Sequence, residues 1–400
     1  MQKNYKTAVV GGGAAGFFLA INLKEMCPQM EVTVVEAARR VLRKVEVSGG
    51  GRCNLTNTFD GVSPDLQGVY PRGHRLLKRL FNVFGPRDAF QWFEQRGVPL
   101  TVQPDHCVFP RSQDSHSIIN LFLDEARRLG IEVQTETRVR SLVDVAGYDF
   151  VCVTTGGQPH DEGLSWLEQP VEKPVPSLFT FGIADDSLHR LMGTVVERAV
   201  ALIPGTKLRA EGPLLITHWG MSGPCILRLS SFGARWLNEA GYQAPLAVNW
   251  TGSSEGEVYE ALAAIAARHP HRQVASVPPF ELSQRLWAYL VEKSLGLSRV
   301  NVPWNSLSQK EIRRLTNALT NDNYRITARA PFKDEFVTCG GVSLKAVHPQ
   351  TLESRTHPGL FFAGEVLDID GVTGGFNFQA AWTTAYVVAK TVRLKAAISA

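Results

Sequence analysis

The segment that most constrains the fold lies at the start of the chain, where a short β-branched run meets a glycine-rich turn. Residues 6–26 are KTAVVGGGAAGFFLAINLKEM, so Gly11, Gly13 and Gly16 form a G-x-G-x-x-G pattern between a predicted strand and a predicted helix. A second apolar run, EVTVVEA, follows the helix and carries Glu36 twenty residues beyond the last glycine. This order predicts a β-α-β unit and, with it, an α/β fold.

In such a unit each glycine has its own physical reason. Gly11 permits the tight turn, Gly13 lets the backbone approach a pyrophosphate, and Gly16 lets the helix pack closely on the strand. The unpaired N–H groups at the helix N-terminus attract phosphates, and the Glu36 carboxylate is suited to accept hydrogen bonds from a ribose. The pattern therefore predicts a dinucleotide site. It fits NAD and FAD equally, because both carry the same adenosine diphosphate half.

A second glycine–acid turn near the end of the chain favours FAD. The segment GLFFAGEV is a predicted buried strand that ends at Gly364 and Glu365, and a Gly374–Gly375 turn then opens a long apolar helix. A cofactor with a long ribityl arm must be held at both ends, and Glu365 is suited to accept hydrogen bonds from hydroxyl groups along it. The N-terminus of the last helix is expected to face the flavin edge where negative charge develops on reduction.

The stretch EVSGGGRCNLTN, residues 46–57, has three possible interpretations: a linker, a phosphate cradle, or the seat of a reactive thiol. The turn-forming and hydrogen-bonding residues after the glycines argue against a linker, and the first glycine turn already supplies a cradle. We expect Ser48 and the glycines 49–51 to lie against the flavin ring. Cys53 would then be near the reacting face, either as a proton donor or as a small packing residue.

The rest of the chain predicts a domain that is interrupted and then resumed. The segment YDFVCVTTGG is a predicted buried strand ending in a glycine turn at Gly156, and a proline-rich stretch follows it. Short strand-like runs and three helical segments come next, before the strand–glycine–helix pattern returns near the C-terminus. We therefore expect a discontinuous α/β domain with an insertion of small β structure and helices.

Composition excludes several other classes of protein. The six cysteines have no close pair, which argues against a zinc cluster and against the dithiol chemistry of disulfide reductases. Neither a bilayer-spanning apolar run nor a signal peptide is evident, so we expect a cytoplasmic protein without membrane or metal partners.

The net charge of +4 permits an anionic partner. A basic helix face with His74, Arg75, Lys78 and Arg79 is either a solvated surface or a binding patch.

Four segments resemble the signature blocks of the YhiN/BaiN-like family of bacterial FAD-containing oxidoreductases: VSGGGRCNLTN, LLITHWGMSGPCILRLS, VTCGGVSL and GLFFAGEVLDIDGVTGGFNFQAAW. The similarity extends over essentially the whole chain. It implies a glutathione-reductase-type FAD-binding Rossmann domain, discontinuous over residues 1–189 and 335–400. It also implies a β-barrel-like insert over 190–254 and 322–334 and a helical subdomain over 255–321.

The resemblance also places FAD contacts on particular residues, among them the Val139 backbone at the adenine. Together with the turns described above, the expected cofactor-binding residues are Gly11, Gly13, Ala15, Gly16, Glu36, Ser48, Gly49, Gly50, Gly51, Arg52, Val139, Gly156, Gly364, Glu365, Gly374, Gly375 and Asn377.

The family resemblance implies hydride transfer from reduced flavin to a C=C bond conjugated to a carbonyl group. The substrate would be a steroid-like bile acid or a uracil of 23S ribosomal RNA, giving dihydrouridine, and the mild basicity favours RNA. Cys53 is a candidate proton donor, with Arg52 or His218 as electrostatic support. Arg52 could equally anchor the cofactor, and His218 could be structural.

Other functions stay open at this point. Without a second G-x-G-x-x-G pattern, NAD(P)H is expected to bind transiently as electron donor. One alternative function is a flavin-dependent reductase or oxidase of a small enone or amine. Another is a non-catalytic, flavin-containing factor associated with RNA.

Overall fold

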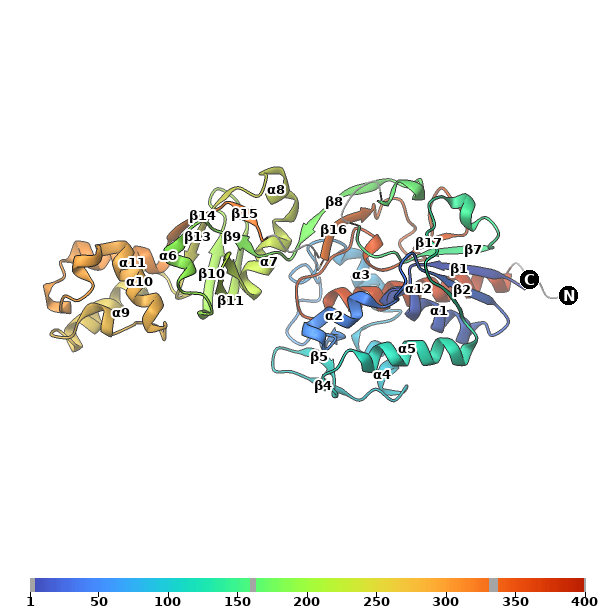
Figure 1. The fold of residues 1–400 in the computed structure, drawn as a ribbon, viewed down its shortest axis with the longest axis horizontal. Coiled ribbons are helices and arrows are strands. Elements are labelled where there is room, and N and C mark those ends of the chain that lie inside the picture. Colours follow the sequence, from blue (N-terminus) through green and yellow to red (C-terminus); the bar gives the residue numbers. More distant parts are fainter. Residues whose placement is uncertain (1–3, 159–162, 331–336, 399–400) are drawn as a thin grey trace. The chain divides into compact units, whose positions relative to one another are not determined.

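A computed structural model of the chain describes residues 4–158, 163–330 and 337–398 (Figure 1). The chain divides into two compact units, one formed by Met1–Pro176 with Val337–Ala400 and the other by Ser177–Phe336. The first unit is therefore discontinuous in sequence, and the second is inserted within it.

A five-stranded parallel sheet forms the centre of the first unit. Strand β1 (Lys6–Val10) lies in the middle, with β2 (Glu31–Val35) and β6 (Glu132–Gln134) on one side and β7 (Phe150–Val153) and β17 (Leu360–Phe362) on the other. Strands β1 and β2 are apolar and almost entirely buried, as expected for parallel strands covered on both faces. Because the order of addition reverses at β1, the carboxyl ends of the central strands form a topological switch point, where such sheets bind ligands.

Helix α1 (Ala14–Met26) packs against α5 (His116–Leu129) and α12 (Phe376–Ile398), and Figure 1 shows α1 beside α12. Residues 15–23 of α1 are all buried, which is why this helix is apolar on every side. The other elements of the unit are α2 (Arg43–Gly51), α3 (His74–Leu80), α4 (Pro86–Glu94), β3 (Thr56–Asn57), β4 (Leu100–Val102), β5 (Cys107–Pro110), β8 (Val171–Ser177), β16 (Val337–Val342) and short 3-10 turns at Leu142–Val145, Ser165–Leu167 and Gly364–Val366.

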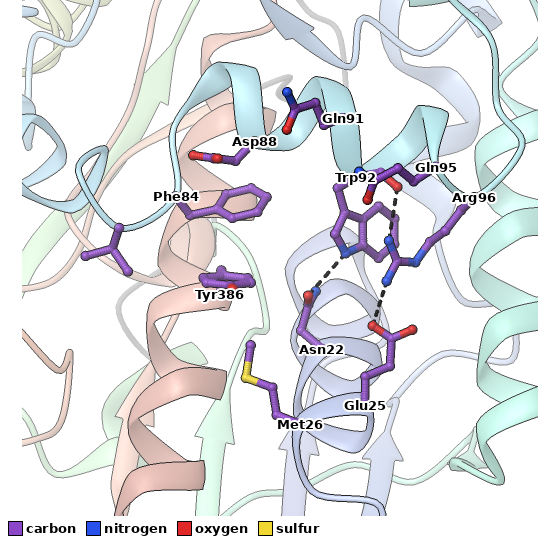
Figure 2. A pocket seen from close by; sticks show the side chains of 11 residues that line it. Asn22, Glu25, Met26, Phe84, Asp88, Gln91, Trp92, Gln95, Arg96 and Tyr386 are labelled. Carbon is purple, nitrogen blue, oxygen red and sulfur yellow. Dashed lines mark hydrogen bonds and ion pairs between the residues drawn. The ribbon is translucent and has the colours of Figure 1, made fainter.

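Helices α1, α4 and α12 border a hollow of about 380 Å³ whose polar side chains bond to one another (Figure 2). The Trp92 indole Nε1 donates to the Asn22 side-chain oxygen at 3.1 Å, and the Asn22 amide donates to the Phe18 carbonyl at 2.6 Å. The Arg96 guanidinium lies 4.0 Å from the Trp92 ring centre and donates to Glu25 at 2.6 Å. These contacts fix α4 on α1, so we assign this hollow to packing.

The Asn22→Ala variant is expected to unfold with a free energy lower by about 2 kcal/mol. Asn22 is 3% exposed, and its removal leaves the buried Trp92 N–H without its acceptor. Urea denaturation measures the difference. The matched control is Gln91→Ala, an exposed position on the same hollow, for which the change should stay within about 0.5 kcal/mol. Equal midpoints for the two variants would contradict the prediction.

The second unit is built on a seven-stranded sheet of order β14-β13-β10-β11-β12-β9-β15, antiparallel at every pairing. Its strands are β9 (Phe181–Gly182), β10 (Val195–Leu202), β11 (Arg209–Thr217), β12 (Gly220–Ser222), β13 (Ala244–Asn249), β14 (Asp322–Ile326) and β15 (Ala328–Arg329). Its helices are α6 (Asp186–His189), α7 (Pro224–Phe232), α8 (Ala234–Glu239), α9 (Glu255–Arg268), α10 (Gln284–Leu295) and α11 (Gln309–Thr320). Helices α9, α10 and α11 overlap the segments GEVYEALAAIAARH, PPFELSQRLWAYLVEKSLG and SQKEIRRLTNALT, which the sequence predicts as helical, although α10 begins only at Gln284. Within the described ranges, no helix combines the length and hydropathy that crossing a bilayer requires.

The boundary between the units lies earlier than the one expected at 189/190. Strand β9 pairs with β12 and β15, and Phe181, Ile183 and Leu188 are buried in the core of the second unit. Residues 177–189 therefore belong to the insertion, because its core covers their apolar side chains. The further division of the insertion at 254/255 and 321/322 stays a prediction.

Candidate dinucleotide site

The three glycines of the first turn lie in three different environments. A Cβ atom on Gly11, whose φ is +116°, would lie 2.4 Å from the Thr154 carbonyl oxygen, and one on Gly16 would lie 2.0 Å from the Gly11 carbonyl oxygen. A Cβ atom on Gly13 would meet nothing within 4 Å. The backbone at the N-terminus of α1 therefore faces open space, and a pyrophosphate can reach the unpaired N–H groups of the first helical turn.

Glu36 directly follows β2, and its carboxylate is held beside the glycine turn. The Gly12 N–H donates to Oε2 at 2.8 Å, and the Ala38 N–H donates to Oε1 at 2.7 Å. Each carboxylate oxygen keeps acceptor capacity after these bonds. Glu36 is therefore oriented to accept hydrogen bonds from a ribose bound at the same turn.

The chain segments after β7 and β17 meet the same turn. The Thr154 hydroxyl, directly after β7, donates to the Gly11 carbonyl at 2.9 Å. Gly364 has a φ of +77°, and a Cβ atom there would lie 2.9 Å from the Ala15 Cβ. The structure therefore brings Ala15 and Gly364, which are far apart in sequence, into contact at the first turn of α1.

Glu365 lies beside that contact, and both of its carboxylate oxygens are engaged. Oε2 accepts from Lys44 Nζ at 2.9 Å, and Oε1 accepts from the Thr338 N–H at 2.8 Å. Gly156 is adjacent, since a Cβ atom on it would lie 3.9 Å from Oε2. Sequence reasoning missed Lys44 and Thr338. The VTCGG motif was a signal for the second, whereas no local pattern separates Lys44 from other surface lysines.

The glycines 49–51 form an irregular end to α2 rather than a helical turn. Gly49, Gly50 and Gly51 have φ values of +57°, +69° and +84°, a left-handed conformation that glycine adopts at little cost. Gly49 and Gly50 are exposed, and a Cβ atom on Gly50 or Gly51 would meet nothing within 4 Å. The Ser48 hydroxyl turns back to the Val45 carbonyl at 2.9 Å. The segment thus presents bare backbone on which a flat ring can lie.

The residues just after Cys53 connect the glycines 49–51 with the Gly374–Gly375 turn through hydrogen bonds and close contacts. With the Asn54 amide in the orientation that satisfies its neighbours, its oxygen accepts from the Gly375 N–H at 3.2 Å, and a Cβ atom on Gly375 would lie 2.2 Å from the Thr56 carbonyl oxygen. The Asn57 side chain donates to the Gly374 carbonyl at 3.1 Å. The segment after the glycines 49–51 is therefore bonded to the turn that opens α12.

Asn377 uses its side chain within the protein. Its oxygen accepts from the Gly371 N–H at 2.8 Å, and its amide donates to the Gly371 carbonyl at 2.9 Å. This pair of bonds closes the loop before the Gly374–Gly375 turn. Asn377 therefore shapes the loop with its side chain, and its contact with a cofactor, predicted from the family resemblance, stays a prediction.

Cys53 lies beside the glycine backbone, but its side chain is 0% exposed. Burial raises the pKa of the thiol to about 12, against a smaller opposing effect of the Ser48 hydroxyl. A side chain that solvent cannot reach does not line the open face presented by Gly50 and Gly51. The geometry favours the packing interpretation of Cys53 over the proton donor.

Cys53 in the native protein is expected to resist alkylation by iodoacetamide at pH 8, since the reagent needs an exposed thiolate. A thiol whose pKa is raised to about 12 carries very little thiolate at pH 8. Mass spectrometry of the Cys53 peptide, with and without guanidinium, measures the protection. The stabilisation from burying the thiol is complete below pH 9 and is lost as pH rises towards 12. Equal labelling of native and unfolded protein would contradict the assignment.

Arg52 is bound to its own turn. Its guanidinium carbon lies 4.3 Å from the Phe109 ring centre, Nε donates to the Gly49 carbonyl at 3.1 Å, and Nη1 donates to the Gln113 side chain at 3.2 Å. Sequence reasoning did not anticipate Phe109 or Gln113. These contacts hold the Arg52 side chain against the glycine backbone and restrict the movement of both.

Two other candidates lie outside these contacts. Val139 follows β6 in an irregular segment and packs, half-buried, against a small core cluster formed by Ala8, Val10 and Val145. His218 belongs to the second unit, where it is exposed at the turn between β11 and β12 beside Trp219, with ring centres 5.0 Å apart. The functional roles of Val139 and His218 stay predictions.

The chain is similar in sequence to curated proteins and similar in fold to a solved structure. The chain is 26% identical to a 3-dehydro-bile acid delta(4,6)-reductase of Clostridium scindens, over 96% of this chain and 98% of that protein. It is 25% identical to a ribosomal RNA dihydrouridine synthase of Haemophilus influenzae, over 98% and 99% respectively. The fold is similar to that of 3-ketosteroid delta1-dehydrogenase from Sterolibacterium denitrificans, with a TM-score of 0.52, 10% identity, and coverage of 98% of this chain and 100% of that one.

Two family models also match the chain. The HI0933-like protein Rossmann domain covers residues 5–164, and the HI0933-like protein barrel and H2TH domain covers residues 175–337. These matches confirm the predicted fold class, and the curated relatives agree with the predicted oxidoreductase chemistry. Because the two models together account for most of the chain, the protein belongs to the HI0933-like family, the group that the sequence indicated as YhiN/BaiN-like.

Proposed function

We propose that this protein is an FAD-dependent reductase of a C=C bond conjugated to a carbonyl group, acting on a uracil of ribosomal RNA. One observation carries the proposal. The open turn at Gly13 and the bare glycine backbone at 49–51 lie in one unit, connected through the Gly364 contact with Ala15 and through α12. A dinucleotide held at the first turn has a second glycine surface available for its other half.

Different residues of the chain would bind different parts of FAD. The N-terminus of α1 would hold the pyrophosphate and Glu36 the ribose. Glu365 would accept from the ribityl hydroxyls with the lone pairs that remain beside its bonds to Lys44 and Thr338. The positive end of α12 would stabilise negative charge on the ring. Bound FAD supplies the hydride. Because Cys53 is buried, we assign proton delivery to solvent or to a group of the substrate-bound complex rather than to this thiol.

The relatives favour this type of reaction. A delta(4,6)-reductase of a 3-dehydro bile acid and a dihydrouridine synthase both saturate a C=C bond conjugated to a carbonyl. RNA is favoured as substrate because a second dihydrouridine synthase, from Escherichia coli, is 25% identical over 97% of this chain, and because the net charge is +4. We infer NAD(P)H as a transient donor.

The test uses FAD-loaded protein under anaerobic conditions. NADH or NADPH is expected to bleach the flavin, and added 23S RNA from a strain lacking the gene is expected to restore the colour and to gain dihydrouridine by mass spectrometry. Reoxidation by a bile-acid dienone but not by RNA would shift the proposal to a small-molecule substrate. Protein that binds no FAD on reconstitution would contradict the enzyme itself.

A further inference from the structure

A second hollow in the first unit, of about 610 Å³, lies along α3. Its floor includes the apolar side chains of Phe59, Leu66 and Phe81, and its rim carries Arg75, Lys78 and Arg79. We call these six residues the α3 groove. It combines aromatic rings with cations, which is the composition of surfaces that bind single-stranded nucleic acids.

The three cations of the α3 groove are exposed and follow each other at helical spacing, so they share one face of α3. Among the described residues, none of the three side chains has a hydrogen-bond or ion-pair partner. The nearby Asp65 interacts with one of them, Lys78: the pKa of its carboxyl is lowered first by the hydrogen bond from the Gln67 N–H and also by the Ser63 side chain and the charges of His74 and Lys78. Like charges this close repel, and a bound polyanion would relieve that repulsion.

The floor of the groove is connected to the turn that opens α12. The Phe59 ring lies 5.1 Å from that of Phe376, the first residue of α12, and the Phe59 N–H donates to Asn57 at 2.8 Å. Asn57 in turn donates to the Gly374 carbonyl at 3.1 Å. A chain bound along α3 therefore passes next to the turn proposed to lie at the flavin ring.

We propose that the α3 groove binds single-stranded RNA flanking the target uracil, an inference that rests on the proposed function. Arg75, Lys78 and Arg79 would contact phosphates, and Phe59 and Phe81 would stack on a flanking base. Single-stranded RNA exposes backbone charge and base faces together, and proteins read it through this combination.

The test is fluorescence anisotropy of a labelled, uridine-rich RNA of about 12 nucleotides with FAD-loaded protein. In the triple variant Arg75→Ala, Lys78→Ala, Arg79→Ala, the slope of log affinity against log salt is expected to fall in magnitude by about 2, since each phosphate contact on a single strand contributes about 0.7. Flavin absorbance per protein verifies that the variant is folded.

Single charge changes provide a matched comparison. Lys78→Glu is expected to weaken RNA binding by at least about fivefold, whereas Lys390→Glu, on an exposed position of α12, should change it by less than about twofold. Asp65→Asn should strengthen it. An unchanged salt slope in the triple variant would overturn the inference, as would a raised KM for NADPH with unaltered RNA binding. Turnover of the wild type is measured separately, so absent dihydrouridine counts against the proposed function and not against the groove.

Discussion

Replacing Gly13 with aspartate is expected to give a folded protein that purifies without flavin. Gly13 is the N-cap residue of α1, its φ of −91° suits any residue, and a Cβ atom there meets nothing within 4 Å. Aspartate is among the best N-cap residues, so the helix itself should not be weakened. The new carboxylate would, however, occupy the space and the N–H groups that the pyrophosphate needs.

Juxtaposed like charges cost several kcal/mol, which corresponds to at least about a 100-fold loss of FAD affinity. Flavin absorbance per protein and thermal unfolding of the apoprotein measure the two effects separately. The control is Gly16→Ala, whose added methyl would lie 2.0 Å from the Gly11 carbonyl oxygen and should lower the unfolding temperature itself. Stoichiometric flavin in Gly13→Asp would contradict the location of the site.

The Asp370→Ala variant is expected to lose about 3 to 5 kcal/mol of unfolding free energy. The Asp370 carboxylate is 0% exposed and pairs with Arg72, whose side chain is 12% exposed. Removing the carboxylate leaves a largely buried guanidinium without its main counter-charge, and that state is far less stable than either a complete pair or an apolar replacement.

Guanidinium denaturation measures the loss, and the double variant Arg72→Met, Asp370→Leu is the informative control. Replacing both charges with apolar side chains should recover most of the stability, because no buried charge remains. Equal destabilisation of the single and double variants would contradict this explanation, because the loss would then come from the packing of the two side chains and not from an unpaired buried charge.

Much of the first unit could be predicted from local pattern. The alternation of apolar runs with glycines marks β1, α1 and β2, and the spacing of Gly11, Gly13 and Gly16 leaves few other folds. FAD was predicted in preference to NAD because the strand–glycine–acid order recurs at Gly364 and Glu365. These features are specified by residues close together in sequence, where steric and hydrogen-bonding rules apply directly.

Other features depend on contacts between distant segments, and local pattern does not reveal them. The burial of Cys53 and the bond from Lys44 to Glu365 arise only when the chain is folded. The hydrogen bonds of Asn377 to Gly371 depend on the shape of a loop. The sequence placed the domain boundary at 189/190, whereas the second unit begins at Ser177. Residues 177–189 are short apolar segments, and local pattern does not show which of two sheets such segments join.

The position of β17 has a consequence for the order in which the protein matures on the ribosome. Strand β7 pairs with β17, and about 200 residues separate the two along the chain. At roughly 5 to 20 residues per second, β7 keeps an unpaired edge for about 10 to 40 s of synthesis, while the whole insertion emerges and can fold. The last helix and its glycine turn arrive later still. If the glycine turns near both ends of the chain hold the cofactor as proposed, flavin can bind only after β17 and the turn before α12 have been synthesised.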